Sequence, residues 1–228
     1  MLHSSSGSPA PSAAEQVYQD VKELILSGGL PGGELISEGE VANRTGCSRT
    51  PVREAFLRLE AEGWMRLYPK RGALIVPVAD GEAEHIVDAR QLLETHSVRY
   101  LAEHAAERAA VVHALDDNLD RQLGIVRDGD VVAFSAADAD FHRLIVRAGD
   151  NPLLDSFYGG LRERQRRMTA RSLARDPEQL PAIVDDHVRL RDLVEAADPD
   201  GYDAALLEHM LSVHALNPRS ANRRGPRT

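Results

Sequence analysis

The chain of 228 residues contains 43% hydrophobic and 28% charged residues, which is enough apolar mass for one large or two modest packed domains. No window approaches the roughly 18 apolar residues of a membrane span, and the start lacks the basic flank and apolar run of a secretory signal, so the sequence predicts a cytoplasmic protein. The formal net charge of −9 argues at first against a nucleic-acid partner, because the field of the whole molecule repels phosphate.

The first expected elements are a loose terminus and two helices. Residues 1–13 are rich in Ser, Pro and Gly without an apolar period, which predicts disorder. Residues 15–27 place apolar side chains at helical spacing and stop at two glycines, which predicts the first helix. Residues 36–47 are expected to form the second helix, because Gly46 suits the left-handed position at a helix end.

A third short helix, expected to be capped by Ser48, is the most informative element. Arg49 and Arg53 project from successive turns near its start, where a recognition helix carries the side chains that pair with base edges. Residues 64–67 and 73–78 are expected to be two strands, whose hairpin tip approaches DNA as a wing. The predicted DNA-binding residues are Ser48, Arg49, Thr50, Arg53, Lys70, Arg71 and Gly72.

Local charge favours this interpretation over the net charge of the whole chain. Between Arg44 and Arg71, seven basic residues stand against three acidic ones. Such a contrast with the rest of an acidic chain indicates a nucleic-acid-binding module joined to another domain. Cys47, the only cysteine, excludes an intrachain disulfide and leaves open a small packed residue or a redox sensor.

From residue 80 onward the pattern predicts an all-α bundle of six or seven helices, separated by short turns rich in Asp, Gly and Pro. The basic tail, residues 217–228, is expected to be disordered. Two apolar stripes at helical spacing are expected to face the core of the bundle: Val87, Leu92, Leu93, Val98 and Leu101 in one, and Ile183, Val184, Val188, Leu190, Leu193 and Val194 in the other.

These segments, in this order along the chain, resemble the domains of one family of regulators. The glycine-rich segment 28–35, the two central helices and residues 63–76 resemble the winged helix-turn-helix of the GntR family, and residues from about 80 to 216 resemble the all-helical FCD domain of its FadR-type branch. The resemblance implies a mainly α fold with a DNA-binding domain in residues 14–78 and an effector-binding domain in residues 79–216. It also implies a homodimer that presents two recognition helices to an inverted repeat in double-stranded operator DNA.

One group of polar residues in the second half has the composition of a metal site. Asp138 and His142 lie four residues apart and so share a helical face, although such a pair is more often a surface ion pair. The resemblance to the metal-binding subset of FCD domains adds His187 and His209, which match the remaining ligands of that subset. One carboxylate and three imidazoles suit Zn(II), with Ni(II) or Mn(II) as alternatives. A polar interior of hydrogen-bonded histidines is the other interpretation of the same residues.

Arg90 matches the Arg-x-x-Leu-Glu phrase of the same domains, in which the arginine points toward the cavity. The resemblance therefore implies that Arg90 binds a small organic acid effector beside the metal. The alternative is an ion pair with Asp88 or Glu94 on an exposed face. A dense run of arginines between residues 162 and 171 stays unassigned, because periodicity alone does not say which of them turns inward.

These features predict a ligand-responsive, sequence-specific transcriptional regulator, a repressor released by its effector, and not an enzyme. The rival hypotheses are a metal-dependent hydrolase with an accessory DNA module and an effector-independent DNA scaffold. Against the hydrolase, the sequence contains no paired-metal motif, nucleophile elbow or general base beside the expected ligands. Gly39 stands where many relatives carry an arginine, so one DNA contact of the family is expected to be missing.

Overall fold

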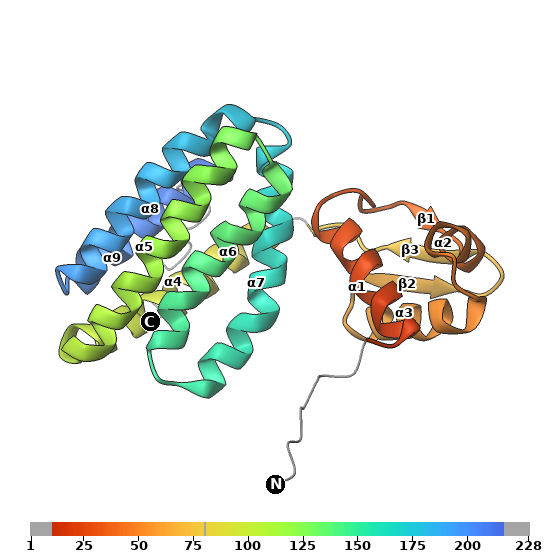
Figure 1. Ribbon diagram of the computed structural model, residues 1–228, viewed down its shortest axis with the longest axis horizontal. Coiled ribbons are helices and arrows are strands. Elements are labelled where there is room, and N and C mark those ends of the chain that lie inside the picture. The colour runs from red at the N-terminus through yellow and green to blue at the C-terminus, as the bar shows by residue number, and fades with distance from the viewer. Residues whose placement is uncertain (1–10, 80, 217–228) are drawn as a thin grey trace, which may run out of the picture. The chain divides into compact units, whose positions relative to one another are not determined.

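The computed structural model describes residues 11–79 and 81–216, which divide after Val78 into two compact units. Helices dominate the described chain (Figure 1), and the predicted mainly α fold is confirmed. The predicted loose segments 1–13 and 217–228 lie almost wholly outside the described residues. Where they overlap, Ser12 accepts a hydrogen bond from the backbone of Glu15 and caps the first helix, so the ordered chain starts earlier than the composition indicated.

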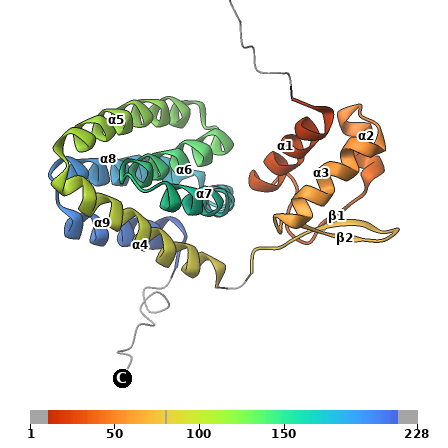
Figure 2. The ribbon, with the colours of Figure 1, turned by 90° about the horizontal axis from the view of Figure 1, so that it is seen from below.

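The N-terminal unit packs three helices on a small antiparallel sheet. Figure 2 shows the helices on one side of the strands. The sheet has the order β1-β3-β2, so the central strand pairs with a short strand from before the helix-turn-helix, which the sequence did not predict. The elements are α1 (Ala13–Leu26), β1 (Leu35–Ile36), α2 (Glu38–Thr45), α3 (Arg49–Ala61), β2 (Met65–Tyr68) and β3 (Gly72–Ile75).

Local sequence explains the sharp ends of α2. Ser37 accepts a hydrogen bond from the backbone of Glu40, and the Glu40 carboxylate accepts one from the backbone of Ser37, which is a complete capping box. At the other end Gly46 has φ 69°, the left-handed conformation predicted for it. The core of the unit is apolar and includes the fully buried Val17, Ile25, Val52, Leu59, Ala73 and Ile75. The helix-turn-helix is therefore held rigidly on the sheet.

The wing hairpin depends on one glycine. Gly72 has φ 102°, and a Cβ atom added there would clash with the backbone carbonyl of Ile36 on the neighbouring strand. Any side chain at this position would combine a strained backbone with a displaced β1. Lys70, at the hairpin tip, also has a positive φ of 64°. The wing is thus a tight turn fixed against β1.

The C-terminal unit is a bundle of six α helices and one short 3₁₀ turn within the described residues, in agreement with the predicted helix number. Figure 1 shows the long helices lying side by side; α6 packs between α5 and α7, and α8 between α5 and α9. No helix among the described residues is long and apolar enough to cross a membrane. The elements are α4 (Glu82–Glu103), α5 (Ala105–Asp128), α6 (Val131–Ala148), α7 (Pro152–Leu173), η1 (Pro177–Gln179), α8 (Leu180–Glu195) and α9 (Pro199–Val213).

Two residues of the predicted apolar stripes do not face the core. Leu92 on α4 is 66% exposed and Val188 on α8 is 41% exposed. The reason is that the inner faces of these helices are partly polar. Arg90 and Glu94 are buried on α4, and His187 is buried on α8. A leucine two positions from a buried arginine lies about 200° around the helix and so points outward.

Candidate metal centre and nucleic-acid interface

The four predicted metal ligands meet inside the bundle. Asp138 and His142 come from α6, His187 from α8 and His209 from α9. All four are buried, and one potential ligand atom from each lies within 4.8 Å of the corresponding atoms of the others. Three separate helices thus bring a carboxylate and three imidazoles to one point.

Two of the imidazoles are oriented by buried partners on other helices. The Nδ1 of His142 donates a hydrogen bond to Glu94 on α4 over 2.8 Å, and the Nδ1 of His187 donates one to Gln122 on α5 over 2.8 Å. These acceptors fix the tautomer, because a carboxylate or amide oxygen takes only a proton donor. The Nε2 atoms of both histidines face the centre and are buried without a hydrogen-bond partner among the described residues. Buried nitrogen lone pairs of this kind are what a metal ion would satisfy.

The third histidine and the aspartate are held in the same way. His209 donates from Nδ1 to Asp186 over 3.1 Å. One oxygen of Asp138 accepts hydrogen bonds from Gln165 at 3.0 Å and Thr169 at 3.2 Å, both on α7. Its other oxygen lies 3.4 Å from the Nε2 of His187. Each ligand therefore presents one free atom to the centre while its second polar atom is anchored elsewhere.

A second buried group adjoins the centre. Arg90 is 1% exposed and donates from Nε to Glu94 over 2.8 Å, whereas its Nη2 has no hydrogen-bond partner among the described residues. Glu94 also accepts hydrogen bonds from the hydroxyls of Tyr158 and Tyr202, each over 2.8 Å. The ion pair considered as the alternative for Arg90 does exist, but in the interior and not on an exposed face. One guanidinium N–H group is left facing the interior without an acceptor.

Burial sets the charges of these groups. Desolvation lowers the pKa of His142, and it lowers the pKa of His187 to about 3, so both imidazoles are neutral near neutral pH. Burial alone would raise the pKa of Glu94, but Arg90 and His142 outweigh that effect and hold it at about 2. Burial alone would also raise the pKa of Asp138, but its contacts with His187, His142 and Arg90 outweigh that effect and lower it. Neutral imidazoles and an ionised carboxylate are the forms that bind a divalent cation. The residues present therefore fit a metal ion.

The residues that support the ligands were missed in the sequence. Glu94 stands in the same phrase as Arg90, and Asp186 directly precedes a ligand histidine, so these two carried a local signal. Gln122 carried none, because it lies 65 residues from the histidine that it orients. Pairing across such a separation is set by helix packing, which local periodicity does not report.

One further histidine and two arginines of the unassigned run have structural partners. His214 lies outside the four-residue cluster, and its Nδ1 is 3.0 Å from the hydroxyl of Ser172. In the arginine run of α7, Arg162 pairs with Asp140, and Arg164 pairs with Glu82 over 2.6 Å. These two arginines are thus engaged on the bundle surface.

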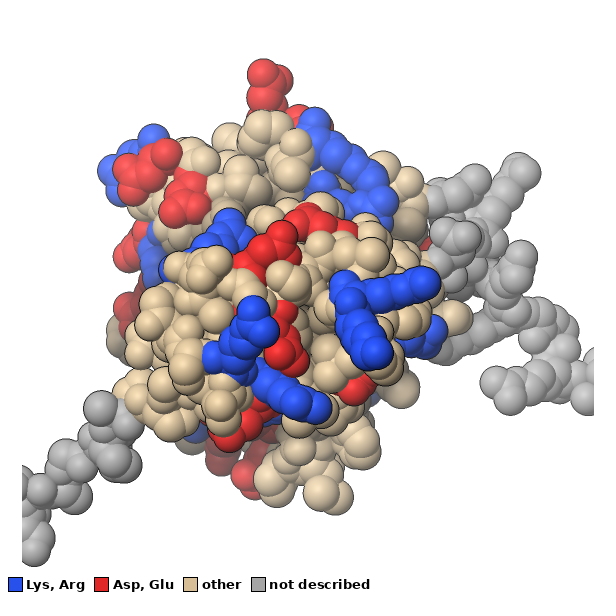
Figure 3. All heavy atoms as spheres, turned by 90° about the vertical axis from the view of Figure 1, so that its right-hand side faces the viewer, with Lys and Arg blue, Asp and Glu red and all other residues tan. Residues whose placement is uncertain are grey.

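A groove in the N-terminal unit collects most of the predicted DNA-binding residues. It encloses about 660 Å³ between the start of α3 and the wing. Its basic lining consists of Arg49, Arg53, Lys70 and Arg71, and Gly72 lines it as well. Figure 3, which looks onto this unit, shows Lys and Arg side chains in several groups with acidic side chains between them. A helix start and a hairpin tip with cationic side chains are suited to phosphate and base contacts.

Three further positions refine this picture. Ser48 occupies the N-cap position of α3, as predicted, but its side chain makes no capping hydrogen bond. The Ser48 and Thr50 side chains are exposed instead. Gly39 lies on α2 beside the recognition helix, where an added Cβ would be 3.7 Å from the Nη2 of Arg49. The missing side chain thus leaves space around Arg49, the first of the two arginines predicted to contact bases.

Comparison with known proteins assigns both units. Residues 13–75 match the bacterial regulatory proteins of the gntR family, and residues 85–212 match the FCD domain. The chain belongs to the GntR family. Members of this family are transcription regulators that bind operator DNA, not enzymes, so the predicted family and the predicted absence of enzyme activity are confirmed.

Curated relatives of this GntR protein are named as repressors. A probable D-xylose utilization operon transcriptional repressor from Paenarthrobacter nicotinovorans is 31% identical over 93% of this chain and 90% of its own. The galactonate operon transcriptional repressor of Escherichia coli is 26% identical over 84% of this chain and 90% of its own. The gluconate operon transcriptional repressor of Bacillus subtilis is 30% identical over 66% of this chain and 61% of its own.

The fold of this GntR protein is shared with solved structures. Escherichia coli McbR/YncC gives a TM-score of 0.74 at 24% identity, covering 90% of this chain and 97% of its own. A GntR regulator from Rhodococcus sp. RHA1 gives 0.69 at 17% identity, covering 90% and 97%. A winged helix-turn-helix joined to a helical bundle is therefore the common architecture of these proteins.

Proposed function

We propose that this GntR protein is a repressor that releases its operator when a small organic acid binds at a metal centre in the helical bundle. The observation that carries the proposal is the convergence of unsatisfied buried atoms. The Nε2 atoms of His142 and His187 and the Nη2 of Arg90 are buried without hydrogen-bond partners among the described residues. Leaving such atoms unpaired is costly, so a bound cation and a bound anion together account for them.

The cation is expected to be Zn(II), with Ni(II) or Mn(II) as alternatives. Asp138, His142, His187 and His209 would hold it, and a set of one carboxylate and three imidazoles suits all three metals. A bound divalent cation supplies a Lewis acid to which a carboxylate oxygen coordinates. The chain itself keeps the imidazoles of His142 and His187 neutral by burial. It orients the three histidines through hydrogen bonds from Nδ1 to Glu94, Gln122 and Asp186.

The effector is expected to be a small carboxylate held through Arg90. The free Nη2 of this guanidinium would donate to a carboxylate oxygen, and such charge-assisted bonds are among the stronger ones in a dry interior. The galactonate and gluconate operon repressors are named for sugar acids, which are hydroxycarboxylates. These names favour the same chemical class here, because a hydroxycarboxylate offers several oxygens to a metal and an arginine.

The functional unit is expected to be a homodimer that binds two operator half-sites. Repression through an inverted repeat needs two recognition helices at a fixed spacing. The bundle exposes large apolar side chains that a second copy would cover. Leu153 and Phe157, one turn apart on α7, are 71% and 73% exposed, and Leu92 is 66% exposed on α4, which packs against α7. Exposed apolar side chains of this size are typical of subunit contacts.

The effector would act by preferring the dimer conformation that does not fit the operator. The change in DNA affinity then equals the difference in effector affinity between the two conformations, typically about 1–3 kcal/mol. A bundle whose helices are joined at one polar centre is suited to this coupling. The ligands and their supporting residues come from α4, α5, α6, α7, α8 and α9, so a shift at the centre reaches every helix of the bundle.

The test combines metal analysis with a thermal-shift screen of organic acids on the full chain. We expect about one divalent ion per chain, and we expect a sugar acid or related carboxylate to raise the Tm of metal-loaded protein. The conservative Arg90→Lys variant should keep its metal but lose most of the acid-dependent shift, because lysine cannot reproduce the guanidinium geometry. The matched control, Arg189→Lys on the exposed face of α8, should respond as wild type. Wild-type protein that purifies without metal and takes up none would contradict the proposal.

A further inference from the structure

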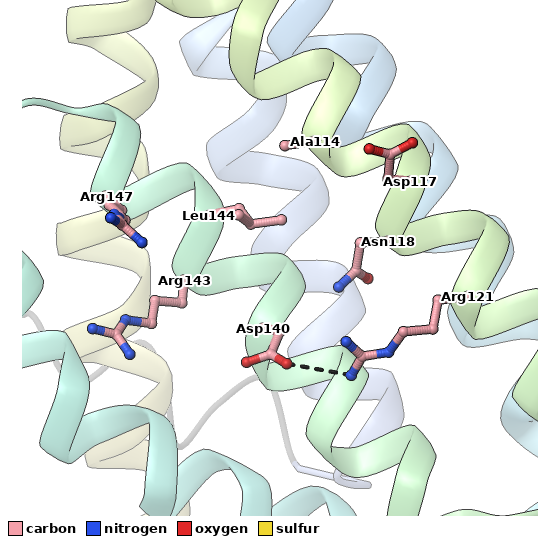
Figure 4. Close-up of a pocket in the computed structure, with 8 residues that line it drawn as sticks. All are labelled: Ala114, Asp117, Asn118, Arg121, Asp140, Arg143, Leu144 and Arg147. Atoms are coloured by element: carbon pink, nitrogen blue, oxygen red, sulfur yellow. Dashed lines mark hydrogen bonds and ion pairs between the residues drawn. The ribbon is translucent and has the colours of Figure 1, made fainter. Parts of the chain in front are cut away.

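A groove on the bundle surface lies between α5 and α6, away from the atoms that face the metal centre. It encloses about 450 Å³ (Figure 4). Figure 4 shows Asn118 on α5 pointing into the space between the two helices, near Leu144 of α6. The groove is lined by Ala114, Asp117, Asn118, Arg121, Asp140, Arg143, Leu144 and Arg147.

The arginines of this groove keep N–H donors that are not engaged in the ion pairs described below. Arg121 contacts Asp140 through a single nitrogen at 3.3 Å, and Arg143 contacts Asp155 through its Nε at 3.0 Å. Arg147 is exposed and makes no ion pair within residues 11–79 and 81–216. An arginine can form two parallel bonds to an oxyanion, so each of these side chains keeps donors for a ligand. The groove thus offers three arginines against two aspartates, Asp117 and Asp140.

The floor of the groove is connected to the metal centre. Asn118 accepts a hydrogen bond from the Nε2 of Gln122 over 2.7 Å, and Gln122 in turn accepts one from the Nδ1 of His187 over 2.8 Å. The Asn118 amide also donates to the carbonyl of Ala137 over 3.2 Å, and this residue immediately precedes Asp138. The Asn118 side chain therefore lines the groove and is also hydrogen-bonded to Gln122, which orients His187, and to the backbone next to Asp138.

We propose that the α5–α6 groove is a second site, for a small oxyanion, and that Asn118 and Gln122 transmit its occupancy to His187. The ligand chemistry is a phosphate or carboxylate group small enough to lie between Arg121 and Arg147. Binding in the groove stands without the metal centre, whereas its transmission rests on the proposed function.

The oxyanion would act by competing for hydrogen bonds. An anion that engages Arg121 weakens the contact of this arginine with Asp140, which lies two residues from the metal-ligand pair of α6. At the floor of the groove an anion oxygen would accept from the Asn118 amide, which now donates to the backbone of Ala137. Both changes alter the position of α6 relative to α5, and so the distance between Asp138 and His187.

The binding test uses calorimetric titration of the full chain, treated with a chelator so that the metal centre does not itself bind the probe. The probes are inorganic phosphate and succinate, which distinguish a phosphate from a carboxylate ligand. We expect saturable binding of one of them at one site per chain. Arg147→Ala and Arg143→Ala should each weaken it about tenfold, the effect of one charge-assisted hydrogen bond. The exposed Arg189→Ala control on α8 should bind as wild type. Absence of saturable binding, or binding unchanged in both groove variants, would overturn the site.

Transmission is tested by measuring zinc affinity with and without saturating probe. In wild type the probe should change the zinc affinity severalfold. In Asn118→Ala the probe should bind more weakly, because one donor is lost, and at saturation it should leave the zinc affinity of the variant unchanged. A probe that binds the groove in wild type without changing zinc affinity would disprove the connection while the site stands. A protein that binds zinc but no probe would disprove the groove and leave the proposed function intact.

Discussion

Glu94 accepts a hydrogen bond from the Nδ1 of His142 over 2.8 Å and, on its other oxygen, one from the Nε of Arg90 over 2.8 Å. A single buried carboxylate therefore joins the residue expected to bind the effector to a residue expected to bind the metal. Movement of Arg90 toward an anion would change the acceptor that orients His142. This shared partner gives the two halves of the proposed site a physical reason to respond together.

Glu94→Gln should lower zinc affinity by about 10–100-fold, because the imidazole of His142 loses its anionic partner and becomes a poorer ligand. The amide keeps the shape of the carboxylate and one acceptor oxygen, so the fold should survive with a lower Tm. Competition with a chromogenic chelator measures the affinity, and circular dichroism checks the fold. The control is Glu208→Gln, whose carboxylate is 71% exposed in an ion pair with Arg189. Equal zinc affinity in both variants would show that Glu94 does not support the centre.

The metal-free protein should lose stability on mild acidification. Unfolded histidines take up a proton as the pH falls through about 6.5, whereas burial holds the pKa of His187 at about 3 and lowers that of His142. Between these pH values the unfolded chain binds more protons than the folded one, so the free energy of unfolding falls by about 1.4 kcal/mol per pH unit for each such histidine. Urea titrations from about pH 7 to about pH 5 measure the slope.

A matched pair of variants tests whether His187 causes this pH dependence of stability. His187→Gln removes one buried imidazole. It should therefore reduce the change in the free energy of unfolding per pH unit by the contribution of one histidine. The control, His113→Gln, replaces an exposed histidine of α5 that lies outside the four-residue cluster. If the His187→Gln slope equals the wild-type slope, the buried imidazole is not the source of the pH dependence.

Arg49→Ala should weaken operator binding by about 1–3 kcal/mol and relax base preference at one position of each half-site. The side chain is exposed on α3 and lines the groove beside the wing, so its removal should not change the melting temperature. A gel shift beside a melting curve measures both effects. Arg189→Ala, on the surface of the bundle, serves as the control. Unchanged DNA affinity in a stable Arg49→Ala protein would remove the recognition role from this arginine.

Gly72→Ala should destabilise the N-terminal unit by several kcal/mol, because it combines a left-handed backbone with a clash against the carbonyl of Ile36. Gly39→Ala is the matched control. It lies in α2 with the nearest atom 3.7 Å away, so alanine there should be neutral or stabilising by up to about 1 kcal/mol. Thermal melts of both variants measure the difference. A Gly72→Ala protein as stable as wild type would mean that β1 moves aside at little cost.

Phe157→Glu should convert a dimer into monomers if the exposed apolar positions of α7 form the subunit contact. A buried charge without a partner is strongly unfavourable at an interface, while the monomer surface gains only an exposed carboxylate. Sedimentation analysis over a concentration series reports the mass. Leu123→Glu, at an exposed position on α5, tests whether any exposed apolar residue has the same effect. A dimer that persists in Phe157→Glu would place the contact elsewhere.

The sequence by itself determined the elements that depend on neighbours along the chain. Gly46 takes the left-handed conformation at the end of α2. This conformation depends only on the helix end and the turn that follows it, and glycine adopts it at little cost, so the local sequence was enough to predict it. Arg49 and Arg53 share the start of a helix because 3.6 residues complete a turn. Two members of the candidate metal centre were also indicated by local spacing, since Asp138 and His142 lie one turn apart, whereas His187 and His209 followed only from the resemblance to FCD domains.

Only the tertiary structure decided which residues complete that centre and which face of each helix is inside. Glu94 reaches His142 across 48 residues, and Tyr202 reaches Glu94 across 108. Leu92 lies outside although its apolar side chain suggested the core, because buried polar groups occupy the opposite face of α4. A hydrogen bond between distant helices depends on how they pack, and the free energy of a satisfied polar interior outweighs the hydrophobic preference of a single side chain.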